Sequence, residues 1–422
     1  MVYVLSKSGS PLMPSERHGH IRKLLKNNLA RVIQRTPFTI QLLYDTPNEI
    51  QDIALGVDTG SNFIGLSAST EKKEVFSGEV ELRNDVHDNL QSRKMMRRTR
   101  RNRKTRYRKA RFNNRHIPNG WLPPTILQKE NSHLQAIKKL HKILPIAKIR
   151  MEIGNFDTQK LENPDISGIE YQQGEQLDFW NTREYVLFRD KHKCQVCHGK
   201  SKDTILNVHH IKQRKDGGSD SPKNLITLCE TCHKNYHKGT LKYTFDKPSN
   251  AFLGLKDAAH MNTMKWKLYN DLKELYSNVE VTFGYITKSK RIELGIEKQH
   301  YNDAYIIANN LSAVHMTSIY KYKCIRSHNR SLHKMLPSKG GIRKPNVLPK
   351  YMFGYQNNDK VKIMTANEVG FITSRRKSGS FTIKDINGKM VKESITYKKL
   401  KLLESRKTMI VGMLKRVFKK EN

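Results

Sequence analysis

The sequence predicts an α/β protein built from several domains. The chain has 422 residues, enough for two to four domains with separate cores, and 36% of its residues are apolar. Strand-like and helix-like segments alternate along most of its length. A segment with two cysteine pairs interrupts this alternation, and about the last 70 residues read as strands with an Asn-Gly turn. We therefore expect an inserted module and a small C-terminal β-barrel.

The first 50 residues predict a small basic unit. VYVLS is typical of a strand, and ARVIQRTPFTIQLLYD of one or two more. HIRKLLKNNLA predicts a short helix with Ile21, Leu24, Leu25 and Leu29 on one side. Two interpretations stay open for this unit: it only packs on its neighbour, or it contacts nucleic acid.

An aspartate lies inside the next apolar strand. IALGVDTGSNFIGLSAS predicts strand, glycine turn and strand, and EVFSGEVEL predicts a third strand, which together make an antiparallel meander. Asp58 belongs to the first of these strands. Because a buried carboxylate is costly unless it is paired, hydrogen-bonded or bound to a metal, this residue predicts a partner elsewhere in the chain.

The charge of the chain indicates a polyanionic partner. It has 78 Lys and Arg residues against 39 Asp and Glu residues, a formal net charge of +39. Nucleic acid is the expected partner, since no segment approaches the roughly 20 apolar residues of a membrane-spanning helix. The N-terminus also lacks the apolar core of a signal peptide, so we expect no membrane and a soluble intracellular protein.

The positive charge is concentrated in RKMMRRTRRNRKTRYRKARF. Eleven of the eighteen residues from Lys94 to Arg111 are Lys or Arg, and residues 89–129 contain no acidic side chain. The composition favours a helix without an apolar stripe, so its expected packing partner is a phosphate backbone and not a protein core. A disordered basic tail is the alternative. The expected nucleic-acid-binding residues are Arg93, Arg97, Arg98, Arg100, Arg101, Arg103, Arg106, Arg108 and Arg111.

Two further segments supply carboxylates that could join Asp58. IAKIRMEI predicts a strand that ends near Glu152, and HYNDAYIIANNL predicts a helix with His300 and Asp303 on one face. Three carboxylates and an imidazole would suit two Mg²⁺ ions that clamp a phosphodiester. Each acidic residue taken alone is more often structural, so the prediction rests on their order along the chain.

The inserted module contains two CxxC pairs. Cys194, Cys197, Cys229 and Cys232 have the spacing of a four-thiolate Zn²⁺ site, and a module this small is expected to need the metal for its fold. Both pairs also read CxxCH, the attachment signature of c-type haem. The absence of an export signal and the internal VHHI segment argue against haem.

The remaining residues of the module resemble the HNH endonuclease motif, a β-hairpin and helix that hold one metal ion, here expected to be Mg²⁺. The resemblance makes His210 the general base and turns His209 the other way, toward the metal. Asn224 would orient the base or shape the loop, and His233 would ligate the metal, with His237 one turn later as a second candidate ligand. A zinc ribbon that only binds is the alternative.

The order of these segments resembles a split ribonuclease H-like RuvC nuclease with an inserted HNH domain. GVDTGSNFIGLS, IRMEIGNF and HYNDAYIIA correspond to its three pieces, which puts Asp58, Glu152, His300 and Asp303 at the family's metal-binding positions. With the N-terminal SGSPLMP stretch, the chain resembles the IscB family, transposon-encoded relatives of type II CRISPR effectors. The expected domains are PLMP (1–50), RuvC part I (51–82), bridge helix (83–115), RuvC part II (116–180), HNH (181–245), RuvC part III (246–330), linker (331–350) and C-terminal β-barrel (351–422).

The resemblance implies an RNA-guided double-stranded DNA endonuclease. A guide omega RNA would pair with one DNA strand, HNH would cut that strand, RuvC would cut the displaced one, and the C-terminal barrel would read a motif beside the target. The resemblance implies a monomeric ribonucleoprotein with target DNA, Mg²⁺ in both nuclease sites and structural Zn²⁺. It also implies a cytoplasmic, nucleoid-associated protein of a prokaryote. Two alternatives stay open: a protein-only DNA endonuclease of the homing or junction-resolving type, and a non-catalytic RNA- or DNA-binding protein.

Overall fold

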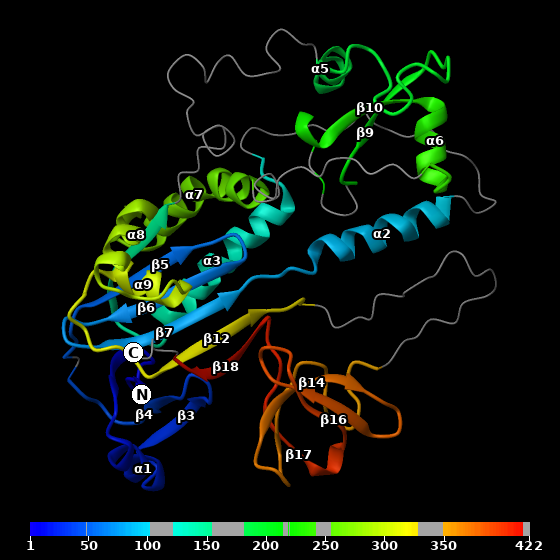
Figure 1. Cartoon of the computed structure of the whole chain (residues 1–422). Coiled ribbons are helices and arrows are strands. Elements are labelled where there is room, and N and C mark those ends of the chain that lie inside the picture. Colours follow the sequence, from blue (N-terminus) through cyan, green and yellow to red (C-terminus); the bar gives the residue numbers. More distant parts are fainter. Residues whose placement is uncertain are drawn as a thin grey trace. The chain divides into compact units, whose positions relative to one another are not determined.

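A computed structural model describes residues 1–47, 49–101, 121–153, 181–213, 218, 220–241, 255–327 and 349–416 (Figure 1). The chain divides into two compact units. The first joins Met1–Gly154 to Thr263–Asn422, and the second is Asn155–Asn262. No helix in the described ranges is long and apolar enough to cross a membrane.

The first unit begins with a four-stranded sheet in the order β2-β1-β4-β3 and one helix. These elements are β1 (Val2–Leu5), β2 (Pro11–Ser15), α1 (His18–Lys26), β3 (Ala30–Gln34) and β4 (Thr39–Leu42). Ile21 and Leu24 of α1 are buried in the core of this sheet, as their spacing predicts, and Leu25 packs against it. Leu29 does not share that face: the helix ends at Lys26, and Leu29 is 42% exposed.

A seven-stranded sheet in the order β11-β8-β5-β6-β7-β12-β18 forms the centre of the first unit. The strands β6 and β18 run antiparallel to the other five. The predicted meander is present as β5–β7. The strands are β5 (Ile53–Thr59), β6 (Phe63–Ser69), β7 (Glu74–Glu81), β8 (Ile146–Ile153), β11 (Val279–Phe283), β12 (Ser318–Cys324) and β18 (Met409–Lys415).

Helix α9 (His300–Ala308) lies directly on this sheet, over β5 and β6 (Figure 1). Two glycines allow the close approach: a Cβ on Gly56 would collide with the backbone of Ala304, and one on Gly65 with the carbonyl of His300. Helix α8 (Gly284–Glu293) packs against α9 and β11. The remaining helices are α2 (Val86–Arg101), α3 (Pro124–His141) and α7 (Leu255–Leu275).

The C-terminal region divides between two sheets. Its antiparallel sheet has the order β16-β15-β14-β13-β17 and buries Val361, Ile372 and Phe381 in one core. Strand β18 is not part of it, which corrects the prediction that residues 351–422 form one barrel: β18 pairs with β12 along its whole length. The small sheet consists of β13 (Lys360–Ile363), β14 (Val369–Arg375), β15 (Ser380–Lys384), β16 (Met390–Thr396) and β17 (Leu400–Glu404), with the 3₁₀ turn η5 (Tyr397–Lys399).

The second unit contains a β-hairpin between two helices. Strand β9 (Leu206–His210) pairs antiparallel with β10 (Leu225–Cys229), and α6 (Glu230–Lys238) follows β10 at once. Helix α5 (Thr182–Arg189) precedes the hairpin, and the 3₁₀ turn η3 (Pro222–Asn224) leads into β10. Asn181 caps α5, because its side chain accepts a hydrogen bond from the Glu184 amide at 3.0 Å.

Candidate metal centres

The first candidate centre is a carboxylate cluster formed by Asp58, Glu152, His300 and Asp303. Asp58 and Glu152 lie on neighbouring parallel strands, one residue beyond the pair Val57 and Met151. The Thr59 hydroxyl donates to the Glu152 carbonyl at 2.6 Å and ties the two strand ends together. Asp58 is 8% exposed, so its carboxylate needs compensation from its neighbours.

Helix α9 brings the two other members of the cluster to these strand ends. The Nδ1 atom of His300 lies 2.7 Å from Oδ2 of Asp58, although the residues are 242 positions apart. The His300 ring also stacks on Phe63, with ring centroids 5.3 Å apart. Because Gly56 and Gly65 admit the helix at close range, the first turn of α9 reaches Asp58. The structure thus brings three chain segments together.

The cluster holds more negative charge than its surroundings neutralise. Burial, together with the charge of Asp58, raises the pKa of Glu152 to about 7 and the pKa of Asp303 to about 6. A hydrogen bond to Asp58 raises the pKa of His300. Two neighbours favour the ionised carboxylates. Arg291 Nε lies 3.1 Å from Asp303 Oδ1, and Thr287 stabilises the charged form of Glu152.

This donor set fits a hard divalent cation. Mg²⁺ prefers carboxylate oxygens and keeps several waters, and three crowded carboxylates at strand and helix ends offer such oxygens. A cation would also remove the cost of ionising Glu152 and Asp303 beside Asp58. The chemistry of the residues is therefore compatible with the predicted Mg²⁺ ions.

The shifted pKa values predict a pH dependence of stability. A carboxyl whose folded pKa lies above its usual value stabilises the fold while protonated, and this contribution is lost as pH rises through the folded pKa. For Glu152 the window runs from about 4.5 to about 7. We expect Mg²⁺ to raise the melting temperature more at about pH 8 than at about pH 5.5, because protons compete for the same oxygens.

Thermal melts with and without Mg²⁺ at both pH values measure this effect. In Glu152→Gln the Mg²⁺ increment and its pH dependence should shrink, whereas Glu49→Gln, at an exposed position, serves as the matched control. Equal increments in wild type and Glu152→Gln would contradict the assignment of Glu152 to the cluster.

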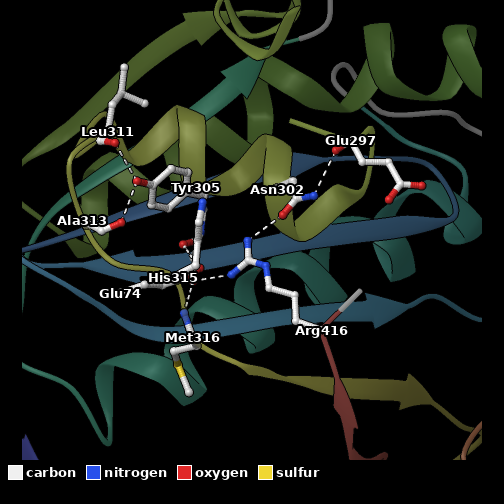
Figure 2. Close-up of polar contacts among 10 residues, drawn as sticks. Glu74, Glu297, Asn302, Tyr305, Leu311, Ala313, His315, Met316 and Arg416 are labelled. Carbon is white, nitrogen blue, oxygen red and sulfur yellow. Dashed lines mark hydrogen bonds and ion pairs between the residues drawn. The ribbon is translucent and has the colours of Figure 1, made fainter. Parts of the chain in front are cut away.

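A buried polar network holds helix α9 through Asn302 (Figure 2). Arg416, which follows β18, donates from Nη1 to Glu74 Oε2 and from Nη2 to Asn302 Oδ1, both at 2.5 Å. Asn302 also donates to the Glu297 carbonyl at 2.9 Å. Because Asn302 lies between His300 and Asp303 in sequence, this network holds the helical turn that carries the two cluster residues. Glu74 and Arg416 side chains are 0% and 2% exposed, so loss of either would leave a buried charge unpaired.

The second candidate centre is a histidine cluster in the second unit. His209 of β9 and His233 and His237 of α6 offer ligand atoms that all lie within 4.8 Å of one another. Nε2 of His233 and Nε2 of His237 are 3.3 Å apart, as expected for residues four positions apart on a helix. The structure thus brings together the three histidines that the sequence predicts as ligands.

Two imidazoles of this cluster, those of His209 and His233, favour the neutral form. Burial, followed by the charges of His233 and His237, lowers the pKa of His209 to about 4, and burial beside His237 lowers the pKa of His233. Neutral imidazole is the form that binds metals. An all-imidazole set fits a divalent transition ion better than Mg²⁺, which prefers oxygen ligands. The donor chemistry therefore argues against the prediction of Mg²⁺ at this centre.

His210 follows His209 on β9, and because side chains alternate along a strand its ring is expected on the opposite face from the histidine cluster. Its Nε2 lies 2.7 Å from Oδ1 of Asp220, a contact that orients the ring. Asn224 is buried at the base of the adjacent loop, where it donates from Nδ2 to the Lys212 carbonyl at 3.0 Å and accepts from the Lys212 amide at 2.8 Å. These two bonds hold Asn224 to Lys212, which is compatible with the predicted role of Asn224 in shaping the loop.

The four cysteines form a third cluster beside the hairpin. Cys194, Cys197, Cys229 and Cys232 offer sulfur atoms within 4.8 Å of one another, and the sulfurs of Cys197 and Cys229 are 3.8 Å apart. Burial opposes ionisation of Cys197, but hydrogen bonds from Ser201 lower its pKa to about 6. Burial and the neighbouring thiols raise the pKa of Cys232. Four sulfurs at this spacing fit tetrahedral Zn²⁺, which replaces the shared protons when it binds.

The predicted arginine-rich segment is helical as far as the structure describes it. Arg93, Arg97 and Arg98 lie on α2 with exposed side chains, and Arg100 and Arg101 belong to the same helix. Arg103, Arg106, Arg108 and Arg111 lie outside the described residues, as do residues 154–180 and 328–348, which include most of the predicted linker. The exposed arginines give α2 a cationic surface available to phosphates.

Sequence reasoning missed three residues that act on these centres. Asp220 contacts His210, Arg291 contacts Asp303, and Arg416 contacts Asn302. An acidic residue ten positions after His210 was the only local signal for Asp220. Arg416 gave no signal, because 114 residues separate it from Asn302.

Comparisons with solved structures return chains of low similarity. One is Streptococcus thermophilus Cas9 in complex with the GGAA PAM, at 13% identity and a TM-score of 0.32, covering 50% of this chain and 30% of that one. Another is the same organism's Cas9 in complex with the AGGA PAM, at 11% identity and a TM-score of 0.34, covering 59% and 32%. The chain thus spans about a third of the length of these Cas9 chains.

Matches to sequence families identify two regions of the chain. A family described as RRXRR protein matches residues 2–174, and one described as HNH endonuclease matches residues 194–239. The second match includes the three histidines of the second candidate centre and the four cysteines. Over 53 residues the chain is 40% identical to Anaredoxin of Nostoc sp. (strain PCC 7120 / SAG 25.82 / UTEX 2576), covering 13% of this chain and 67% of that protein, so the two share a family there. Residues 194–239 therefore form an HNH endonuclease domain, a metal-dependent phosphodiesterase, and the region that matches the RRXRR family precedes it in the sequence.

Proposed function

We propose that the chain is an RNA-guided double-stranded DNA endonuclease of the IscB family, with an HNH centre and a RuvC-like centre. The observation that carries the second centre is the meeting of Asp58, Glu152, His300 and Asp303 from three distant segments. The strand order β7-β6-β5-β8-β11, with β6 antiparallel, supports a ribonuclease H-like sheet. The formal charge of +39 and the exposed arginines of α2 support a polynucleotide partner.

At the HNH centre, His210 acts as the general base. Asp220 holds the His210 ring through Nε2 and stabilises the imidazolium that forms when Nδ1 takes a proton from water. His209, His233 and His237 would hold a divalent ion, which when bound stabilises the charge that develops on the phosphate. Asn224 holds the backbone of Lys212, two residues after His210, through two hydrogen bonds.

At the RuvC-like centre, the carboxylates would hold two Mg²⁺ ions, which when bound stabilise the attacking and leaving oxygens of the phosphodiester. His300 is positioned by Asp58 and Phe63 beside the reacting phosphate. Arg291 moderates the charge of Asp303, and Arg416 fixes the helical turn that carries the residue. In this proposal the HNH centre cuts the guide-paired strand and the RuvC-like centre cuts the displaced strand.

Replacing His210 with alanine is the sharpest test of the HNH assignment. A positioned general base contributes a factor of about 100 to 10,000, so cutting of the guide-paired strand should fall by at least about 100-fold. The displaced strand should still be cut. Strand-specific labels on a denaturing gel separate the two rates.

Two further variants serve as references for His210→Ala. Asp220→Asn should slow the same strand by about 10-fold, since an amide orients the ring without stabilising its charge. His20→Ala, on the exposed side of α1, should leave both rates unchanged. Loss of both cuts in His210→Ala, with DNA binding intact, would contradict the division of labour.

RNA guidance is tested by purifying the protein from cells that carry its native locus and sequencing the RNA that co-purifies. We expect one structured RNA with a variable guide segment, and we expect RNase treatment to abolish DNA cutting. A preparation that contains no RNA and still cuts would identify a protein-only endonuclease instead. A preparation that carries the RNA but cuts neither strand in divalent metal would identify a non-catalytic binder.

A further inference from the structure

A cationic pocket lies in the first unit, away from the carboxylate cluster. Its volume is about 210 Å³. It is lined by the end of β3 and the loop after it, the C-terminal end of α3, the loop after β17, and strands of the seven-stranded and five-stranded sheets. Five basic side chains line it, against one acidic side chain, Glu404. The basic residues are Lys139, Lys142, Lys360, Arg406 and Lys407.

Two of the five cations are already accommodated by the protein. Lys360 donates from Nζ to Thr36 Oγ1 at 2.7 Å and to the Val411 carbonyl at 3.2 Å, and it lies 3.7 Å from Glu404 Oε1. Arg406 donates from Nη2 to the carbonyl of Arg326. Glu404 is thus used by Lys360 and by Thr36, whose hydroxyl donates to it at 2.7 Å.

The other three cations have no counterion in the described part of the chain, where none of Lys139, Lys142 and Lys407 forms an ion pair with a carboxylate. Burial, and then repulsion from Lys407 and Lys142, lowers the pKa of Lys139. The nearby Cys324 thiol supplies no negative charge at neutral pH, since burial raises its pKa to about 11. The C-terminal end of α3 favours cations on its last turn, but Lys407 comes from a different element and is not explained by it.

We propose that this pocket binds a backbone phosphate of the polynucleotide, with Lys139, Lys142 and Lys407 as its ligands. Uncompensated like charges cost free energy, and an anion between them converts repulsion into attraction. The cavity is smaller than the roughly 300 to 1,000 Å³ of pockets for drug-sized ligands, and it suits a compact anionic group. That the phosphate comes from a polynucleotide rests on the proposed function.

The pocket is lined by elements that are distant in sequence, so a ligand bound in it would connect them. Gln34 and Thr36 belong to the N-terminal sheet region, Lys139 and Lys142 to α3, and Lys407 to the segment between the small sheet and β18. One phosphate held by the three lysines contacts α3 and the segment that leads into β18. Binding of the polynucleotide should therefore stabilise these two parts of the first unit together.

The test compares two double variants with the same loss of charge. Lys139→Gln with Lys407→Gln removes two pocket ligands, whereas Lys23→Gln with Lys72→Gln removes two exposed lysines elsewhere in the first unit. Affinity for a 40-nucleotide RNA hairpin is measured as a function of salt concentration. Each lost phosphate contact reduces the slope of log K against log salt by about 0.7 to 0.9.

We expect the pocket variant to lose about one unit of slope and about 10-fold in affinity at low salt, and the control to lose clearly less of both. Lys139→Arg with Lys407→Arg, which keeps the charge, should restore most of the slope. Equal losses in the pocket variant and the control would overturn the proposal. A chain that binds no RNA in any form would instead overturn the proposed function, so the two failures are distinguishable.

Two further arms identify the source of the phosphate. The same salt titration is run with single-stranded DNA of equal length, in the background His210→Ala with Asp58→Asn to prevent cutting. A slope loss with RNA alone assigns the site to RNA, and a loss with DNA alone assigns it to DNA. If inorganic phosphate raises the melting temperature of wild type but not of the pocket variant, while neither polynucleotide slope changes, the site takes a free anion and the polynucleotide assignment is overturned.

Discussion

Asp58→Asn is expected to reduce cutting of the displaced strand by at least about 1,000-fold while the guide-paired strand is still cut. Asparagine keeps the shape of the side chain but removes the charge that would face the metal ions and that now accepts from His300 at 2.7 Å. Metal ions contribute several kcal/mol to phosphodiester hydrolysis, and each 1.4 kcal/mol is a factor of ten in rate. Two strand-specific labels on one DNA duplex measure both rates in the same reaction.

The loss in Asp58→Asn should not come from unfolding. Because the charge of Asp58 helps to raise the pKa of Glu152 and of Asp303, its removal relieves repulsion in the metal-free protein. The melting temperature without Mg²⁺ should therefore stay level or rise. Asp52→Asn, at an exposed position just before β5, is the matched control and should cut both strands at the wild-type rate. Continued cutting of the displaced strand by Asp58→Asn would remove the carboxylate cluster from the mechanism.

Cys194→Ser is expected to unfold the HNH domain locally and to abolish cutting of the guide-paired strand. The buried part of its core consists of Leu228 and three cysteines, so little apolar surface is available to hold the hairpin on α6 without metal. Structural Zn²⁺ contributes folding free energy of about 10 kcal/mol or more in small modules. The variant should contain less than the wild-type amount of zinc, and proteases should cleave it between about residues 181 and 245.

Cys324→Ser separates loss of zinc from loss of a buried cysteine. Cys324 is 8% exposed on β12, in the other unit, and its replacement should leave the zinc content unchanged. Chelation of zinc from wild type should reproduce the behaviour of Cys194→Ser. Full zinc content in Cys194→Ser would show that the four thiols do not form one site.

The local parts of both centres could be predicted from the sequence, because they depend on short-range periodicity. His233 and His237 share a helical face through their spacing of four, and His209 and His210 face opposite ways because strand side chains alternate. The order of Asp58, Glu152 and Asp303 along alternating strands and a helix was enough to predict that they meet. The strands that contain Asp58 and Glu152 do lie side by side in the sheet.

The long-range contacts could not be predicted in the same way. The pairing of β18 with β12 looks, in sequence, like one more strand of the C-terminal sheet, since both sheets require the same alternation of apolar residues. The contact of Arg416 with Glu74 joins residues 342 positions apart, and no local pattern marks either one. A single arginine with a structural role is also hard to recognise in a chain this basic, because Arg416 is one of 78 Lys and Arg residues.

The link between Arg416 and Asn302 has a consequence for how the protein is made. Asn302 of helix α9 is synthesised 114 residues before Arg416, which holds it. Glu74 is synthesised 342 residues before the same arginine. Until Arg416 is synthesised, the buried Glu74 carboxylate lacks the guanidinium that pairs with it. The turn of α9 that contains Asn302 also lacks its hydrogen bond to Arg416. If this centre cleaves DNA as we propose, nascent chains should be unable to do so until Arg416 has been synthesised.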